Sequence, residues 1–106
     1  MNFIEEIINL IELKKEGNYW DFKEYWHDNN ADLLHDIICF ANNLANRDSY
    51  IIIGVEDKSY TITDVKNDPN RKNQQNIIDF LKSKKFIGGI RPDIEVKTIE
   101  IQNCEI

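Results

Sequence analysis

The feature that most constrains this chain is the run Tyr50-Ile51-Ile52-Ile53-Gly54-Val55, which is apolar throughout and is the strongest strand signal present. Successive side chains of a strand point to opposite faces of a sheet. A run without polar alternation therefore predicts a strand that is buried on both faces. The rest of the chain must supply elements that cover this strand on each side.

Other patterns predict those elements. Residues 3–15 carry apolar side chains at helical spacing, and Gly17 is expected to end that helix as a C-terminal glycine. Alternation between Tyr19 and Trp26 predicts a strand. The remaining expected elements are helices over about 31–45 and 73–84, a short strand over 59–65 and a last strand over 94–101. The order αβαββαβ predicts an α+β fold, a mixed β-sheet with about three helices.

Length and composition fit one soluble domain spanning residues 1–106, with 42% hydrophobic and 30% charged residues. No apolar run approaches the roughly 20 residues that cross a bilayer. The acidic N-terminal segment lacks the basic residues of a signal peptide, so we expect a cytoplasmic protein without membrane association. Cys39 and Cys104 are too few for a disulfide framework and are expected to be reduced.

The charge balance bears on the choice of partner. The net charge is −6, and lysine is the commoner basic residue, although arginine makes the better bidentate phosphate contacts. This balance disfavours a protein that coats DNA without sequence preference. It counts less against a metal-dependent enzyme, because a carboxylate cluster is itself acidic until the metal binds.

Four residues form the most informative constellation: Glu16, Asp21, Lys23 and Asp57. Asp21 and Lys23 are two apart on a strand and so share one face, about 7 Å apart. If this strand lies beside the central one, Asp21 and Asp57 converge and Glu16 completes a three-carboxylate site. Mg²⁺ prefers such oxygen ligands and can activate water, while Lys23 adds positive charge. The alternative is that these acids merely face solvent, since a D-x-K pair often arises by chance.

Candidate nucleic-acid contacts are aromatic or basic. Tyr19 and Tyr25 are expected on the face of Asp21, where they could stack on unpaired bases, whereas Trp20 and Trp26 are expected in the core. The basic cluster is Lys82, Lys84 and Lys85. It either binds phosphate or is a solvated helix end.

Two other sites are not expected. His27 and His35 match no metal-binding spacing and are expected at the surface. No G-x-x-x-x-G-K-S/T loop is present, so ATP binding by this chain alone is not expected.

Three strings together resemble the Schlafen-type AlbA domain, in the right order and over about residues 16–101. They are Tyr19-Trp20-Asp21-Phe22-Lys23, Cys39-Phe40-Ala41-Asn42-Asn43 and Ile51-Ile52-Ile53-Gly54-Val55-Glu56-Asp57. The resemblance implies a hydrolase, a metal-dependent endoribonuclease that cuts tRNA-like RNA with Mg or Mn. Its catalytic residues would be Glu16, Asp21, Lys23 and Asp57, with the three acids as metal ligands. The alternative is a non-catalytic DNA- or RNA-binding or oligomerisation module of a larger bacterial regulator or defence protein.

The sequence departs from the family pattern in two places, and the resemblance has two further implications. Asp21 stands where glutamate is commoner, and residues 44–49 replace the usual Gly-Gly, so whether the chain is an enzyme stays open. Schlafen nucleases pair two related lobes, which implies a homodimer here, with RNA favoured over DNA as partner. Gln102-Asn103 is similar to the turn before a return strand, so we expect the N-terminal part of a longer protein.

Overall fold

The computed structural model of the chain describes residues 2–41, 48–83, 94–102 and 104–106. Its elements are α1 (Phe3–Glu12), β1 (Trp20–Lys23), α2 (Asn30–Ala41), β2 (Tyr50–Ile53), α3 (Gln74–Lys82), β3 (Glu100–Ile101) and β4 (Cys104–Glu105). The described part thus combines three helices with two two-stranded sheets, and the predicted α+β class is confirmed. None of its helices has both the length and the apolar character needed to cross a membrane.

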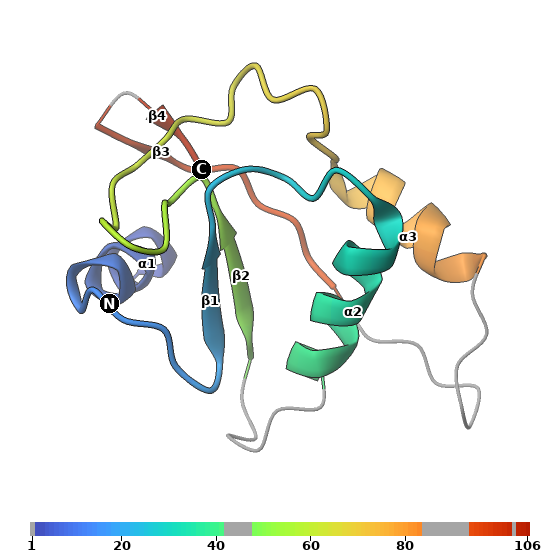
Figure 1. Cartoon of the computed structure of the whole chain (residues 1–106), viewed down its shortest axis with the longest axis horizontal. Helices are drawn as coiled ribbons and strands as arrows, with labels where there is room; N and C mark the ends of the chain where they lie inside the picture. The colour runs from blue at the N-terminus through green and yellow to red at the C-terminus, as the bar shows by residue number, and fades with distance from the viewer. Residues whose placement is uncertain (1, 42–47, 84–93, 103) are drawn as a thin grey trace.

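The strands β1 and β2 pair in parallel, with Asp21 opposite Ile51 and Lys23 opposite Ile53. The first strand therefore lies beside the central one, which is the condition under which Asp21 and Asp57 were expected to converge. The helix α2 connects them, because parallel strands need a crossover connection. Figure 1 shows α1 on one side of this pair, with α2 and α3 on the other.

Two hydrophobic clusters cover the two sides of the sheet, as the apolar run predicts. The first contains Ile7, Leu10, Trp20, Phe22, Ile52 and Val55. The second contains Leu33, Ile37, Ile77 and Leu81, with Trp26, Leu34, Ile51, Phe80, Ile94 and Val96 packed against it. Because Ile51 and Ile52 are neighbours, their side chains point to opposite faces and join different clusters. The strand predicted between Tyr19 and Trp26 ends at Lys23, and Trp26 packs, partly buried, against the second cluster and not beside Trp20 in the first.

The first helix ends earlier than predicted. The Asn2 side chain accepts a hydrogen bond from the Glu5 amide (2.8 Å) at its start, and the helix ends at Glu12. The left-handed residue after it is Lys14 (φ 53°), not Gly17. Gly17 is required for another reason: a Cβ there would lie 2.3 Å from carbons of the Trp20 ring.

The predicted strand over 59–65 is reduced to a single antiparallel bridge between Val55 and Ile62. The backbone turns twice in this segment, since Tyr60 (φ 57°) and Asp64 (φ 62°) are left-handed, and an extended strand cannot continue through such residues.

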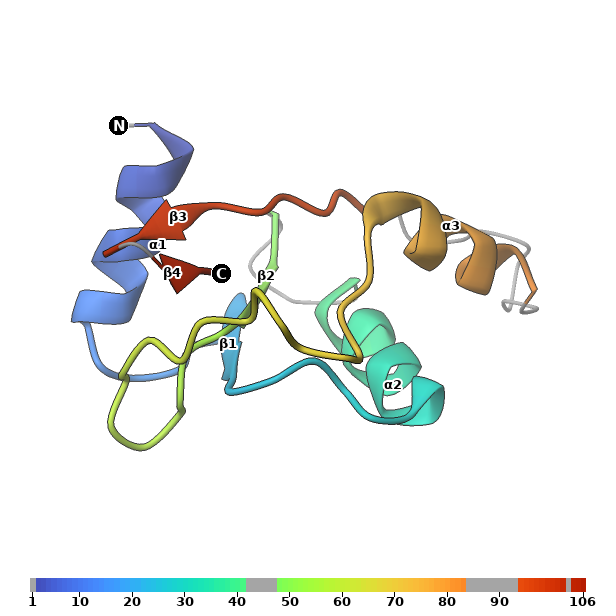
Figure 2. The same cartoon turned by 90° about the horizontal axis from the view of Figure 1, so that it is seen from above.

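The predicted last strand is also shorter. Of residues 94–101, only Glu100–Ile101 form a strand, and they pair with β4 in a separate antiparallel hairpin. Ile94 and Val96 instead pack against the α3 cluster, and the Val96 amide donates to Gln74 Oε1 (3.2 Å). Figure 2 shows the hairpin lying against α1, where Ile99 and Ile106 pack on the first cluster.

Candidate functional site

Asp21 and Lys23 share one face of β1, as predicted, and they form an ion pair. The Lys23 Nζ lies 2.9 Å from Asp21 Oδ2 and 3.6 Å from Asp36 Oδ2 on α2. The same Asp36 oxygen lies 2.6 Å from His27 Nε2. The four side chains therefore form a chain of contacts, Asp21–Lys23–Asp36–His27, between the sheet and α2.

The pKa of Lys23 reflects opposed effects. Partial burial disfavours the charged ammonium and lowers its pKa. The hydrogen bond and charge of Asp21, together with those of Asp36, outweigh burial and raise the pKa above its ordinary value. Lys23 is therefore a fixed positive charge at neutral pH.

Glu16 lies at the edge of β1 that faces away from β2. Its Oε2 accepts a hydrogen bond from the Phe22 amide (3.0 Å), and the adjacent Gly17 amide donates to the Trp20 carbonyl (3.2 Å). The segment before the strand thus satisfies backbone groups that would otherwise be unpaired at a sheet edge.

Asp57 is exposed in the turn that follows β2. Beside it, the Glu56 carboxylate accepts hydrogen bonds from the Ser59 hydroxyl and from the amides of Ser59 (2.9 Å) and Lys58 (3.1 Å). These bonds, the Ser59 hydroxyl above all, lower the pKa of Glu56. The turn is thereby fixed by Glu56 and leaves Asp57 on its outer side.

The structure does not assemble the three acids as a ligand set. Asp21 lies opposite Ile51, and Asp57 follows Ile51 by six residues and lies beyond the end of the strand. Across residues 2–41, 48–83, 94–102 and 104–106, no three His, Cys, Asp or Glu side chains are close enough to hold a metal ion. The role of Glu16, Asp21 and Asp57 as ligands of Mg or Mn therefore stays a prediction.

A cleft of about 960 Å³ opens next to the Lys23–Asp36–His27 contacts. It lies at the carboxyl end of β1 and is lined by residues 25–28, by the start of α2 and by the loop 63–70. In Figures 1 and 2 the segment between β1 and α2 runs alongside this loop. Its lining residues are Lys23, Tyr25, Trp26, His27, Asp28, Asp32, His35, Asp36, Thr63, Asp64, Lys66, Asn67, Asp68, Pro69 and Asn70. The lining combines aromatic rings with many hydrogen-bonding groups.

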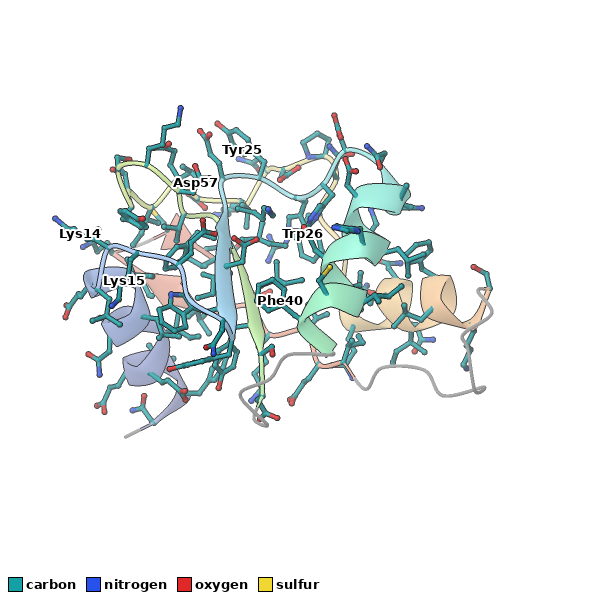
Figure 3. The ribbon with its side chains drawn as sticks, turned by 60° about the horizontal axis from the view of Figure 1, so that its bottom comes forward. Lys14, Lys15, Tyr25, Trp26, Phe40 and Asp57 are labelled. Atoms are coloured by element: carbon teal, nitrogen blue, oxygen red, sulfur yellow. The ribbon has the colours of Figure 1, made fainter. Side chains whose placement is uncertain are left out.

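Tyr25 is an exposed aromatic residue whose backbone is held on both sides. Tyr25 is 58% exposed and lines the cleft. On one side the Glu24 carbonyl accepts from Thr63 Oγ1 (2.7 Å), and on the other the Trp26 amide donates to Asp68 Oδ2 (2.8 Å). Figure 3 shows Tyr25 pointing outward, while Trp26 lies between the sheet and α2.

Two cleft residues were not found from the sequence. His27 was predicted at the surface, but its side chain is only 6% exposed, because it packs against Asp36. Asp36 was not singled out, although it lies on α2 between Leu33 and Ile37, which are buried. The sequence did carry a signal for Asp36, because it is a charged residue next to the apolar stripe of a predicted helix. His35 is exposed, as predicted.

Tyr19 and Lys82, two other predicted nucleic-acid contacts that the structure describes, do not line the cleft. Tyr19 is half-buried against the first cluster, with its ring centroid 4.6 Å from that of Trp20. Lys82 is exposed in the last turn of α3. Lys84 and Lys85 lie outside the described residues.

Comparison with known proteins gives a family. The family model for the Schlafen AlbA_2 domain matches residues 16–106, which is most of the chain. Searches of curated proteins and of solved structures each found no match. The family match supports a function connected with nucleic acid. The resemblance seen in the three sequence strings is thus confirmed, and this chain belongs to the Schlafen AlbA_2 family.

Proposed function

We propose that the chain binds nucleic acid in the cleft at the carboxyl end of β1, with RNA favoured over DNA. The observation that carries this proposal is Tyr25, which is 58% exposed although hydrogen bonds hold the backbone on both sides of it. Unpaired bases stack on such aromatic side chains. A ring presented by a fixed backbone loses little conformational freedom when a base stacks on it.

The position of the cleft supports the same proposal. In sheets with parallel strands, ligands bind outside the carboxyl ends of the strands. The cleft lies at this end of β1, and β1, α2 and β2 form one βαβ unit. The exposed aromatic ring therefore lies where this kind of architecture places its ligands.

The test is fluorescence anisotropy with short single-stranded RNA and DNA of the same sequence, and with duplex RNA. Tyr25→Ala should weaken binding by about 5- to 150-fold, the range of one lost stacking interaction. Tyr25→Phe keeps the ring and should bind like the wild type. The matched control is Leu13→Ala, which removes another exposed large side chain, 53% exposed and outside the cleft. Unchanged binding by Tyr25→Ala would contradict the proposal.

A second candidate is the metal-dependent endoribonuclease that acts on tRNA-like RNA with Mg or Mn. It is favoured by Asp21 and Lys23, which share one face of β1 and lie within the residues that the family model matches, although Asp21 stands where glutamate is commoner. For metal binding, Lys23 would have to leave Asp21, and Glu16 and Asp57 would have to approach.

The test of this second candidate is cleavage of labelled tRNA with Mn²⁺, with Mg²⁺ and with a chelator. Asp21→Asn should abolish cleavage, while Asp79→Asn, an exposed acid on α3 outside the cleft, should not. Equal cleavage by wild type and Asp21→Asn would refute it.

The homodimer, and the alternative role as an oligomerisation module of a larger regulator or defence protein, also stay predictions. Sedimentation at several protein concentrations tests the dimer, and the same runs with RNA show whether assembly depends on the ligand. A single monomeric species throughout would contradict both. Fluorescent tagging in cells would test the predicted cytoplasmic location.

A further inference from the structure

We infer that the cleft admits an unpaired base that carries an amino group, and that it discriminates against uracil. This inference deepens the proposed function and rests on it. The lining charges, the acceptor groups on α2 and the shape of the cleft each contribute to it.

The charges of the lining decide which part of a nucleotide enters. Its five carboxylates face two ammonium groups, which leaves a net charge of −3 when both histidines are neutral. The acids are Asp28, Asp32, Asp36, Asp64 and Asp68, and the lysines are Lys23 and Lys66. Because Lys23 is already paired with Asp21 and Asp36, little positive charge remains for a phosphate. The uncharged base therefore enters, and the phosphate stays outside.

The acceptor groups decide which base is preferred. Asp28 and Asp32 are exposed, and each carboxylate accepts from the Asn29 side chain, at 3.5 and 2.8 Å. A carboxylate offers about four acceptor sites and no donor, so both retain acceptor capacity. Cytosine, adenine and guanine present amino donors, and an acid that accepts from the cytosine amino group is a known pairing. Uracil has no amino group, and its single edge donor, N3–H, lies between two carbonyl oxygens, which carboxylates repel.

The size and the remaining wall groups of the cleft admit a base. A volume of about 960 Å³ lies at the upper end of the range for small-ligand pockets. Tyr25 supplies a stacking face, and His27, also in the wall, has an Nδ1 with no hydrogen-bond partner among the described residues. This Nδ1 is a buried polar atom without a partner in a residue of the cleft wall, and such unmet hydrogen-bonding capacity is unusual in a folded protein.

The test compares oligocytidine with oligouridine of about eight nucleotides, a typical single-strand site size, near neutral pH. Both carry the same phosphates, so the ratio of their dissociation constants isolates the base. Oligocytidine should bind at least about fivefold tighter. The double variant Asp28→Asn/Asp32→Asn should bring the ratio close to one, because asparagine is neutral and can also donate. Asp79→Asn should leave the ratio unchanged.

The outcomes separate this inference from the proposed function. Equal binding of the two oligomers, weakened for both by Tyr25→Ala, would overturn the inference and leave the function standing. If no oligonucleotide binds, the proposed function fails and the inference with it. Binding of a lysine-rich peptide instead, lost in the double variant, would assign the cleft to a basic protein partner and overturn both.

Discussion

At the scale of single residues, Lys23 determines what Asp21 can do. Its ammonium lies between Asp21 and Asp36, so the acid that the sequence offers as a metal ligand already has a cation beside it. Asp36 comes from α2, and no spacing within the strand motif reveals it. One residue from a neighbouring element thus changes the electrostatics of a motif that the sequence presents as complete.

The raised pKa of Lys23 predicts a pH dependence of stability. Its folded-state pKa exceeds the ordinary value of 10.5, so its contribution is fully present below about pH 10.5 and is lost as pH rises through the folded-state pKa. Lys23→Met should lower the free energy of unfolding by less than about 1 kcal/mol at neutral pH, because the pair is partly exposed. Urea denaturation should show this difference shrinking above pH 10.5.

The control for this prediction is Lys97→Met, which removes the exposed Lys97–Glu95 pair (3.5 Å). A difference between wild type and Lys23→Met that grows at high pH would contradict the raised pKa.

Glu16 has a structural contact that is independent of any metal. Glu16→Ala removes the acceptor of the Phe22 amide and should cost about 1 kcal/mol of unfolding free energy, whereas Glu16→Gln keeps an acceptor and should cost less. Glu12→Ala, an exposed acid in the same region, is the control. If Glu16→Ala is as stable as wild type in urea, the contact does not stabilise the strand edge.

At the scale of elements, the end of β2 depends on a residue without a side chain. Gly54 has φ 112°, and a Cβ there would lie 3.4 Å from the Glu105 carbonyl oxygen and from Ile106 Cα. The Gly54 amide donates to the Lys23 carbonyl (2.7 Å), so this conformation holds the ends of the two parallel strands together. It also lets the C-terminal hairpin pass close to β2.

Gly54→Ala should therefore lower stability by about 1–3 kcal/mol, the usual cost of an unfavourable backbone conformation. For a domain of this size, each kcal/mol corresponds to about 4–8 °C in Tm. Gly17→Ala should also destabilise, but through the Trp20 ring, which near-UV circular dichroism detects. A Gly54→Ala protein that melts with the wild type would show that the strand end tolerates a side chain.

At the scale of the whole molecule, the net charge of −6 shapes how it meets nucleic acid. Non-specific binders release counterions through many phosphate contacts, and their affinity falls steeply with salt. Among the described residues that line the cleft, only Lys23 and Lys66 supply ammonium groups. Binding should therefore rest on stacking and hydrogen bonds more than on phosphate neutralisation.

The salt dependence of RNA binding measures this balance. Because Lys23 is paired with Asp21 and Asp36, Lys66 is left as the phosphate contact of the lining. One contact on a single strand predicts a slope of log affinity against log salt of about −0.7. Lys66→Met should make the slope shallower, while Lys82→Met, outside the cleft, should not. A slope steeper than about −4 would show that phosphate contacts elsewhere on the surface carry the binding.

The sequence by itself determined the parts of the fold that depend on local pattern. The apolar run at 50–55 required cover on both faces, and helical spacing located three helices, because burial and periodicity are properties of neighbouring residues. Both β1 and β2 were located by pattern, whereas their pairing came from the structure. The three strings also sufficed to indicate the family.

Only the tertiary structure decided which side chains meet. The alternation at 94–101 predicted a strand. Ile94 and Val96 are instead partly buried by packing near α3, and only Glu100–Ile101 of this segment pair with another strand. In the register between β1 and β2, Asp21 lies opposite Ile51, and Asp57 follows the end of β2. The position of α2 against the sheet brings Asp36 beside Lys23. The cleft around Tyr25 likewise joins segments about forty residues apart, as the Trp26–Asp68 contact shows. Such contacts depend on register and crossover geometry, which no local sequence pattern encodes.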